Sequence, residues 1–371
     1  MKNEIPDSNE LEITLFGAGY GESVVIHVGD GKWIIIDSAM PSNSQEPYAL
    51  KYLKDIGFDI ASQVIGVIIT HWHDDHIRGI SEIAEKCVSA QFYISAALTN
   101  ANNHKQFLKL ILDSSIQRRA NITVGSISGV NEFSKLLKTL KDRNDVPNYA
   151  DQGKLLLSGP NFALFALSPH KEVFNQAIDS ILSLIPSEGE VERIPAPKAN
   201  QTSVVLWLRF GNNIRALLGA DLEENKEHKG WSLILSRKQD FIIDKKADLF
   251  KIPHHGSITG HHEDVWKQLL NDNPICLIAP FRRGIRLPKK SDVNRITKFT
   301  NNLYITHSDI QKPNFKAVKD KHVRRRLVEV GAIIPEQQQQ AFNYIKTRKK
   351  FDEDWNISLS GLASLLSSSK F

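Results

Sequence analysis

Residues 70–76 read Thr-His-Trp-His-Asp-Asp-His, a segment dense in side chains that bind metal ions. Within it, His71, His73, Asp75 and His76 follow the pattern His-x-His-x-Asp-His. Successive side chains of an extended backbone point to opposite sides, so His71 and His73 project the same way and can bind one ion. Asp75 and His76 come after the chain has turned, where they can reach a second ion. A solvated loop that is His-rich by chance is the alternative, but histidine is scarce and this order is specific.

These ligand types predict a site for one or two divalent metal ions. Imidazole together with carboxylate suits zinc best, and suits manganese or iron where oxygen ligands dominate. Such ions lower the pKa of a bound water and polarise a carbonyl or phosphoryl oxygen, which is the chemistry of metal-assisted hydrolysis. That chemistry needs no protein nucleophile.

A buried strand is expected to position this loop. Residues 63–69 form an apolar, β-branched run of the kind found in strands that are buried on both faces. Ligand sites in open α/β sheets collect at the carboxyl ends of such strands. The histidines are therefore expected on the loop that leaves the carboxyl end of this strand.

Four motifs, together with the strand upstream of the histidine motif, resemble those of the metallo-β-lactamase-fold hydrolases. Besides the histidine motif, residues 33–38 read as a strand that ends in an acid, Asp37. Residues 15–26 resemble the Gly-rich opening of the branch that contains the soluble hydrolase domain of ComEC-type competence DNA-uptake proteins. Residues 216–221 resemble the strand that delivers a bridging acid, and Lys-Ile-Pro-His-His-Gly-Ser at 251–257 resembles that branch's His-His-Gly-Ser.

The resemblance implies an α/β protein with an αββα sandwich, in which two mixed β-sheets are flanked by helices. A hydrolase domain would occupy residues 1–310. Residues 311–371 would then be a C-terminal basic or helical extension of unknown role. Within it, residues 357–366 are a candidate docking or dimerising segment.

The resemblance also implies a set of metal ligands. They are His71, His73, Asp75, His76, Asp221 and one of His254 and His255. If strand alternation persists to this point, only one of the two adjacent histidines faces the metals. The position directly before the glycine favours His255, and the other histidine would contact substrate or support a ligand.

Catalytic roles follow from the same resemblance. Asp75, or the neighbouring Asp74, would orient or deprotonate the water, and Asp221 would bridge two ions. Asp37 is expected to hold a ligand histidine in its metal-binding tautomer. Ser257 is expected to be a turn residue or a phosphate contact.

One position departs from the family pattern. Asn200 stands where the third histidine of the first metal usually lies, which puts a full set of ligands to that metal in doubt. His170 could compensate, although a histidine after a proline is common at a protein surface and needs no metal.

Composition agrees with a single large domain plus additions. The chain has 371 residues and a net charge of +5, which permits an anionic substrate without requiring one. Its two cysteines show no zinc-knuckle or disulfide spacing, so a reducing cytoplasm is the simplest location. No apolar run approaches the roughly 20 residues that span a bilayer, and residues 1–12 do not resemble a signal peptide. We therefore expect a cytoplasmic protein without a membrane partner.

Two groups of basic residues bear on the substrate. They are Arg282, Arg283, Arg286, Lys289 and Lys290, and further along Lys312, Lys316, Lys319, Lys321, Arg324, Arg325 and Arg326. Such density can neutralise the phosphates of a nucleic acid, but it is equally typical of a solvated surface. Clusters at the rim of the metal site would favour a polymeric substrate, and clusters on the far face would not.

Three functions remain open from the sequence. The leading one is a metal-dependent hydrolase that acts on phosphodiesters, such as a nuclease with nucleic acid as its substrate. The second is a hydrolase of a small ester, lactone, thioester or nucleotide. The third is a non-catalytic, metal-binding regulatory or interaction module, because fold alone decides none of these.

Overall fold

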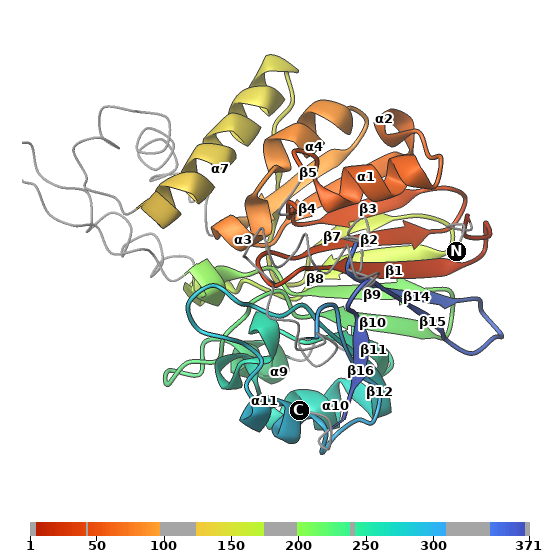
Figure 1. The fold of residues 1–371 in the computed structure, drawn as a ribbon, viewed down its shortest axis with the longest axis vertical. Helices are drawn as coiled ribbons and strands as arrows, with labels where there is room; N and C mark the ends of the chain where they lie inside the picture. Colours follow the sequence, from red (N-terminus) through yellow and green to blue (C-terminus); the bar gives the residue numbers. More distant parts are fainter. Residues whose placement is uncertain are drawn as a thin grey trace, which may run out of the picture.

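A computed structural model describes residues 5–41, 44–96, 124–173, 199–237, 242–308 and 342–367. These residues form two mixed β-sheets that pack face to face, with helices on the outer face of each (Figure 1). This arrangement confirms the predicted αββα sandwich.

The first sheet has eight strands in the order β15-β14-β1-β2-β3-β4-β5-β6. Its strands are β1 (Leu11–Phe16), β2 (Ser23–Val28), β3 (Trp33–Ile36), β4 (Val64–Ile69), β5 (Gln91–Ser95), β6 (Asn148–Ala150), β14 (Tyr344–Lys349) and β15 (Asn356–Ser360). Strands β3 to β6 run parallel, as expected where helices connect neighbouring strands.

The second sheet also has eight strands, in the order β16-β13-β12-β11-β10-β9-β8-β7. They are β7 (Leu155–Ser158), β8 (Phe162–Ala166), β9 (Leu206–Phe210), β10 (Ile214–Leu218), β11 (Ala247–Lys251), β12 (Leu270–Ile278), β13 (Leu303–Ile305) and β16 (Ser364–Leu366). Strands β10 to β13 are parallel, and the remaining pairs are antiparallel.

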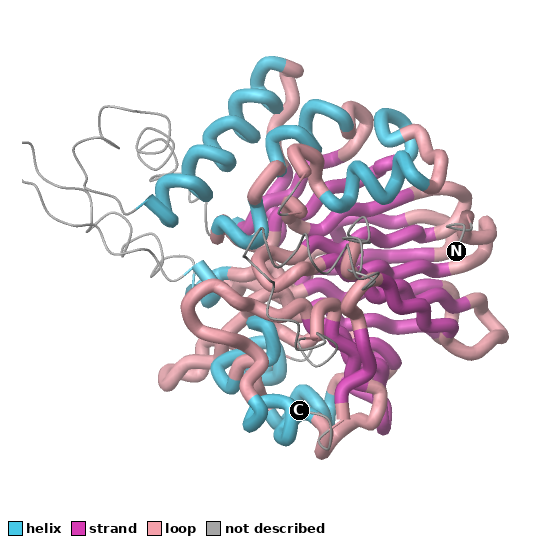
Figure 2. Tube along the Cα trace, in the orientation of Figure 1, coloured by secondary structure: helices cyan, strands magenta, loops and turns pink. Residues whose placement is uncertain are grey.

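Helices cover the outer face of each sheet (Figure 2). The first sheet carries α1 (Tyr48–Asp55), α2 (Ile60–Gln63), α4 (Ile80–Lys86) and α7 (Val124–Asp142), and the second carries α9 (Trp231–Ser236), α10 (Glu263–Gln268) and α11 (Lys290–Ile296). Among the described residues, no helix has the length and apolar character needed to cross a bilayer.

Alternating side chains of the strands divide between three buried layers. In β4, Ile68 points into the layer between the sheets, whereas Val67 and Ile69 point toward the helices. The sheets approach each other closely at Gly66, where a Cβ atom would lie 2.2 Å from Leu157 Cδ1. Every residue of β4 therefore has a packing role, which explains its unbroken apolar sequence.

The C-terminal strands differ from the expected basic or helical extension. β14 pairs with β1 and β15 extends the same sheet, while β16 pairs with β13 of the other sheet. Apolar residues alternate with polar ones in β15, at Ile357 and Leu359, which is the period of a strand. The boundary at residue 310 stays a prediction, although these strands join both sheets beyond it. The basic residues between 312 and 326 lie outside the described residues.

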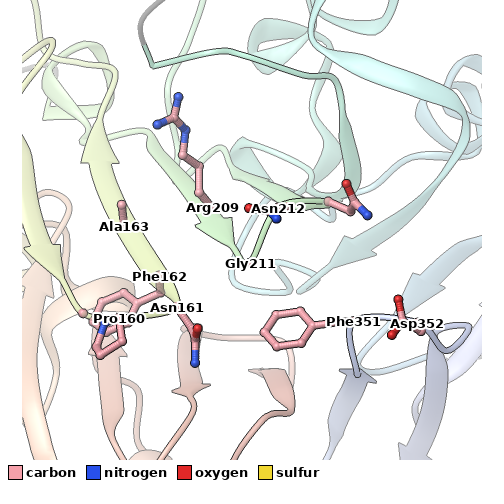
Figure 3. A pocket seen from close by; sticks show the side chains of 11 residues that line it. Pro160, Asn161, Phe162, Ala163, Arg209, Gly211, Asn212, Phe351 and Asp352 are labelled. Atoms are coloured by element: carbon pink, nitrogen blue, oxygen red, sulfur yellow. The ribbon is translucent and has the colours of Figure 1, made fainter.

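A hollow of about 500 Å³ opens at one end of the sandwich (Figure 3). It is lined by the turns at 159–163 and 209–213 and by Phe351 and Asp352. This is the end where β9 finishes and β10 begins, whereas the histidine motif belongs to the opposite end. The hollow is therefore separate from the site described next.

Candidate metal centre

All the predicted ligands except His73 and the alternative His254 fall into two overlapping groups of potential metal ligands, because each follows the carboxyl end of a strand. Asp37 follows β3 and the histidine motif follows β4, and these strands are parallel neighbours. Asp221 follows β10 and His255 follows β11, which are parallel neighbours in the other sheet. The short helix α3 (Asp74–Ile77) marks this end of the sandwich, opposite the hairpin of β14 and β15 (Figure 1).

Four buried side chains form the centre of the site: Asp75, His76, Asp221 and His255. One ligand atom from each lies within 4.8 Å of all the others. His255 Nε2 is 3.2 Å from Asp75 Oδ2 and 3.4 Å from Asp221 Oδ2, and His76 Nε2 is 3.3 Å from the same Asp221 oxygen. Residues separated by 180 positions in the chain thus meet at one point.

Asp37 fixes the orientation of the histidines beside it. Its Oδ1 accepts from the Thr70 amide at 2.8 Å, and its Oδ2 accepts from the Thr70 hydroxyl at 2.7 Å. His76 Nδ1 lies 2.8 Å from the same Oδ2, so the ring donates there and keeps Nε2 unprotonated toward Asp221 when the histidine is neutral. This arrangement supports the expected role of Asp37 in setting a ligand tautomer.

His71 is prepared as a ligand through the same residues. The Thr70 hydroxyl donates to Asp37, so it can accept from His71 Nδ1, which lies 3.0 Å away. That leaves Nε2 of His71 unprotonated, with its lone pair available to a ligand. This buried atom has no hydrogen-bond partner among the described residues. The ring of His73 lies 4.9 Å from that of His71. An ion between these rings would satisfy the unpartnered nitrogen.

The two adjacent histidines after β11 have different surroundings. His255 faces the four-residue cluster and its Nδ1 bonds the Ala279 carbonyl at 3.0 Å. His254 instead contacts Glu223 at 3.0 Å and Thr259 at 2.7 Å. Strand alternation does not separate them, because the strand ends at Lys251 and both histidines have positive φ, 48° and 53°. The tight turn therefore points the two side chains in different directions.

Asn200 lies beside His254, whereas His170 lies outside the metal-ligand clusters of the described residues. Asn200 Nδ2 is 3.3 Å from His254 Nε2, while its buried Oδ1 has no partner in the described structure. His170 accepts from the Glu172 amide at 3.2 Å. The amide oxygen of Asn200 is thus available as a weak ligand. His170 fits the alternative of a histidine that binds no metal.

Ser257 and Asp74 are near the four-residue cluster but are not part of it. Ser257 accepts from the Thr259 amide at 3.3 Å and caps a short turn, as expected of a turn residue. Asp74 Oδ2 accepts from the Tyr20 hydroxyl at 2.6 Å. Asp74 is therefore tied to the Gly-rich loop before β2.

Glu22 and Lys251 belong to the site although sequence reasoning did not single them out. Both are nearly inaccessible to solvent and form a buried ion pair with each other. Lys251 Nζ also donates to the Ala220 carbonyl at 2.8 Å and lies 3.8 Å from Asp221 Oδ1. The available signal was a lysine that closes an otherwise buried strand, since a lysine at such a position requires a charged partner.

The charge on each residue of the four-residue cluster depends strongly on the charges of the other three. Burial opposes the charged form of His76, but Asp221 and Asp75 outweigh it and raise its pKa well above the usual value. Burial also opposes charge on His255, yet Asp221 and Asp75 raise its pKa to about 10. Burial would raise the pKa of Asp221, but His255 and His76 hold it well below its usual value. The cluster thus favours added positive charge, which a divalent cation would supply in place of protons.

Backbone strain concentrates at the same place. Asp37, Ala220, His254 and His255 all have positive φ, between 45° and 58°. Residues other than glycine rarely adopt this conformation, and such strain collects at functional sites. The surrounding sheets evidently hold these turns in place.

Comparisons with known proteins agree with this fold. The model of the metallo-beta-lactamase superfamily matches residues 16–159. A search of curated proteins finds no match. Residues 16–159 are thus similar to this superfamily, and the described residues adopt the metallo-β-lactamase fold. Nothing in these comparisons points to the ComEC-type branch, so that finer resemblance stays a prediction.

Solved structures show weak likenesses. The subclass B3 metallo-beta-lactamase MEM-A1 from a soil metagenome library is 14% identical, with a TM-score of 0.35 over 68% of this chain and 83% of that one. The metallo-beta-lactamase fold protein YhfI from Bacillus subtilis is 14% identical, with a TM-score of 0.31 over 65% and 70%. The hydrolase AbOPH of the beta lactamase superfamily is 13% identical, with a TM-score of 0.34 over 59% and 73%.

The first prediction concerns the paired histidines. His71→Ala and His73→Ala are each expected to lower metal content and hydrolysis while the metal-free protein keeps its circular dichroism spectrum, because both residues lie on a loop. Elemental analysis of dialysed protein measures the effect. His228→Ala is the matched control, since that side chain is 78% exposed. Full metal content in either variant would reject these two ligands.

The second prediction concerns Asn200, whose amide oxygen binds zinc more weakly than imidazole does. Calorimetric titration of metal-free protein with zinc should show two unequal affinities or a single site. Asn200→His should strengthen the weaker site. Two equally tight sites in the unmodified protein would show that another residue completes the first metal.

The third prediction concerns the buried ion pair. Lys251→Met removes the nearest cation from the buried Glu22, which should lower the free energy of unfolding of the metal-free protein by about 3–5 kcal/mol. Glu22→Gln combined with Lys251→Met should recover most of that loss, because the carboxylate that lost its closest cation is then replaced by a neutral amide. Urea denaturation of both variants measures the difference. A single variant as stable as the unmodified protein would contradict the role assigned to this pair.

Proposed function

We propose that this protein is a metal-dependent hydrolase that acts on phosphodiesters, most simply as a nuclease. The observation that carries the proposal is the buried cluster of Asp75, His76, Asp221 and His255, beside a histidine whose Nε2 has no partner in the described structure. Such a set of nitrogen and carboxylate donors fits one or two divalent ions, with zinc favoured by its donor types.

The residues of the chain divide the work of hydrolysis. When bound, the metal supplies an acidified water and polarises the scissile group. Asp221, between His76 and His255, provides the negative charge that offsets repulsion between cations. Asp75 can accept a proton, and Asp74 is the second candidate for that role. Burial of the cluster excludes bulk water and strengthens each of these interactions.

A basic loop supports a phosphodiester substrate over a small neutral ester. Arg283 belongs to residues 281–290, and its guanidinium lies 4.0 Å from Asp74 Oδ2. Arg286, Lys289 and Lys290 of the same loop are exposed. Cations at the rim of a metal site attract phosphates.

A non-catalytic metal-binding module remains the second candidate, because Asn200 replaces a stronger ligand.

The fourth prediction tests the mechanism at Asp221. Asp221→Asn keeps the volume but removes the charge, so kcat for phosphodiester hydrolysis should fall by at least about a hundredfold. Asp221 does not cap a described helix, since the next one begins only at Trp231. Melting temperature, bound metal and hydrolysis are measured on one preparation.

Asp272→Asn serves as the control, since Asp272 is an exposed aspartate on β12. It should keep full activity. A fully active and fully metallated Asp221→Asn variant would sink the mechanism. An unmodified, metal-loaded protein that hydrolyses no phosphodiester would reject the proposed function itself.

A further inference from the structure

Three loops meet beside the metal centre and form a rim. The Gly-rich loop after β1 contacts the histidine motif, since the Glu22 amide donates to the Asp75 carbonyl at 3.0 Å. The loop after β12 contacts the Gly-rich loop, since the Arg282 amide donates to the Gly19 carbonyl at 2.6 Å. Phe281 of that loop lies 5.3 Å from the ring of His255. The rim is thus anchored to ligand-bearing segments of both sheets.

Arg283 is the cation that this rim presents. Its guanidinium lies 4.8 Å from the centre of the Tyr20 ring, and the Tyr20 hydroxyl is bonded to Asp74. The side chain is nevertheless 64% exposed. Phe281 also lies beside Tyr20, with its ring centre 5.8 Å from that of Tyr20. Arg283 is therefore held in orientation by an aromatic face while its donors stay accessible to a ligand.

We propose that Arg283, held over Tyr20, binds a backbone phosphate of a nucleic acid next to the phosphate that is cleaved. This inference rests on the proposed function and names its substrate more closely. A guanidinium presents a planar fork of donors that matches two phosphate oxygens. Asp74 is not part of the metal-ligand clusters among the described residues, so Arg283 reaches a group beside the metal site.

Tyr20 positions Arg283 for this role. Burial and the hydrogen bond to Asp74 raise the pKa of Tyr20, so its hydroxyl stays a donor at neutral pH. The ring then remains fixed to the segment that carries His73 and Asp75. A guanidinium packed on a fixed ring loses less freedom when it binds than a fully mobile one does.

The fifth prediction is a change in the salt dependence of binding. Metal-loaded protein is titrated with a fluorescein-labelled, single-stranded phosphorothioate oligonucleotide, which resists hydrolysis and keeps the backbone charge, from about 50 to 200 mM salt. Arg283→Met should weaken binding about tenfold and reduce the slope of log K against log salt by about 0.7, the value for one phosphate contact on a single strand. Arg283→Lys should keep the slope and lose part of the affinity.

Lys245→Met is the matched control for the lost charge. Lys245 is exposed and bonds Asn212 and Asn213 at the opposite end of the sandwich. It should leave both slope and affinity unchanged. Equal slopes for Arg283→Met and the unmodified protein, or no binding of the oligonucleotide by the unmodified protein, would overturn the inference. If the unmodified protein hydrolyses phosphodiesters but Arg283→Met does not change the slope, the proposed function stands and the Arg283 site is rejected. If Arg283→Met changes the slope but the unmodified protein hydrolyses no phosphodiester, the phosphate site stands and the proposed function is rejected.

Discussion

The burial of like charges at one end of the sandwich is the constraint on which the site depends. Glu22, Asp37, Asp75 and Asp221 are all buried there, and an isolated buried carboxylate is costly. Lys251 neutralises Glu22, and Thr70 and His76 bond Asp37. Asp75 has histidines as its close charge partners, and Asp221 has histidines together with Lys251, whose charge Glu22 already balances. Protons or metal ions must balance that remainder, so the stability of this end and its capacity for cations have one physical origin.

The sandwich architecture makes this concentration of charge feasible. Parallel strands of each sheet end at the same edge, and the two sheets bring their edges together, so four short loops supply the ligands. Apolar layers on both faces of each sheet fix the strand ends. Against that frame, turns such as those at Ala220 and His255 can hold positive φ. The strain is local, and the packed strands on either side bear its cost.

Sequence predicted the parts of this structure that are encoded locally. The histidine motif and its strand needed only short-range pattern, whereas Asp221 and His255 were predicted because residues 216–221 and 251–257 resemble motifs of the metallo-β-lactamase-fold hydrolases. Glu22 and Lys251 escaped notice because their pairing joins segments more than 200 residues apart. β14 was missed for a similar reason: it pairs with β1 across the whole chain, and its lysines and arginines suggest a solvated surface. β14 lies between β15 and β1, and its charged residues conceal the alternation that would indicate a strand.

The side of the candidate metal centre that contains Asp75 and Asp221 is more negative than the side that contains His71 and His73. This difference in charge determines which side is expected to bind a cation first. Asp75 and Asp221 create negative potential at one side, which His76 and His255 share. At the other side, burial lowers the pKa of both His71 and His73, and His76 acts in the same direction. Those two histidines are therefore expected to be neutral, with the amide of Asn200 as the nearby polar group in place of an imidazole. A cation would gain more from the acidic side, so that side should fill first, and an ion on the His71 side would take its remaining ligands from water or substrate.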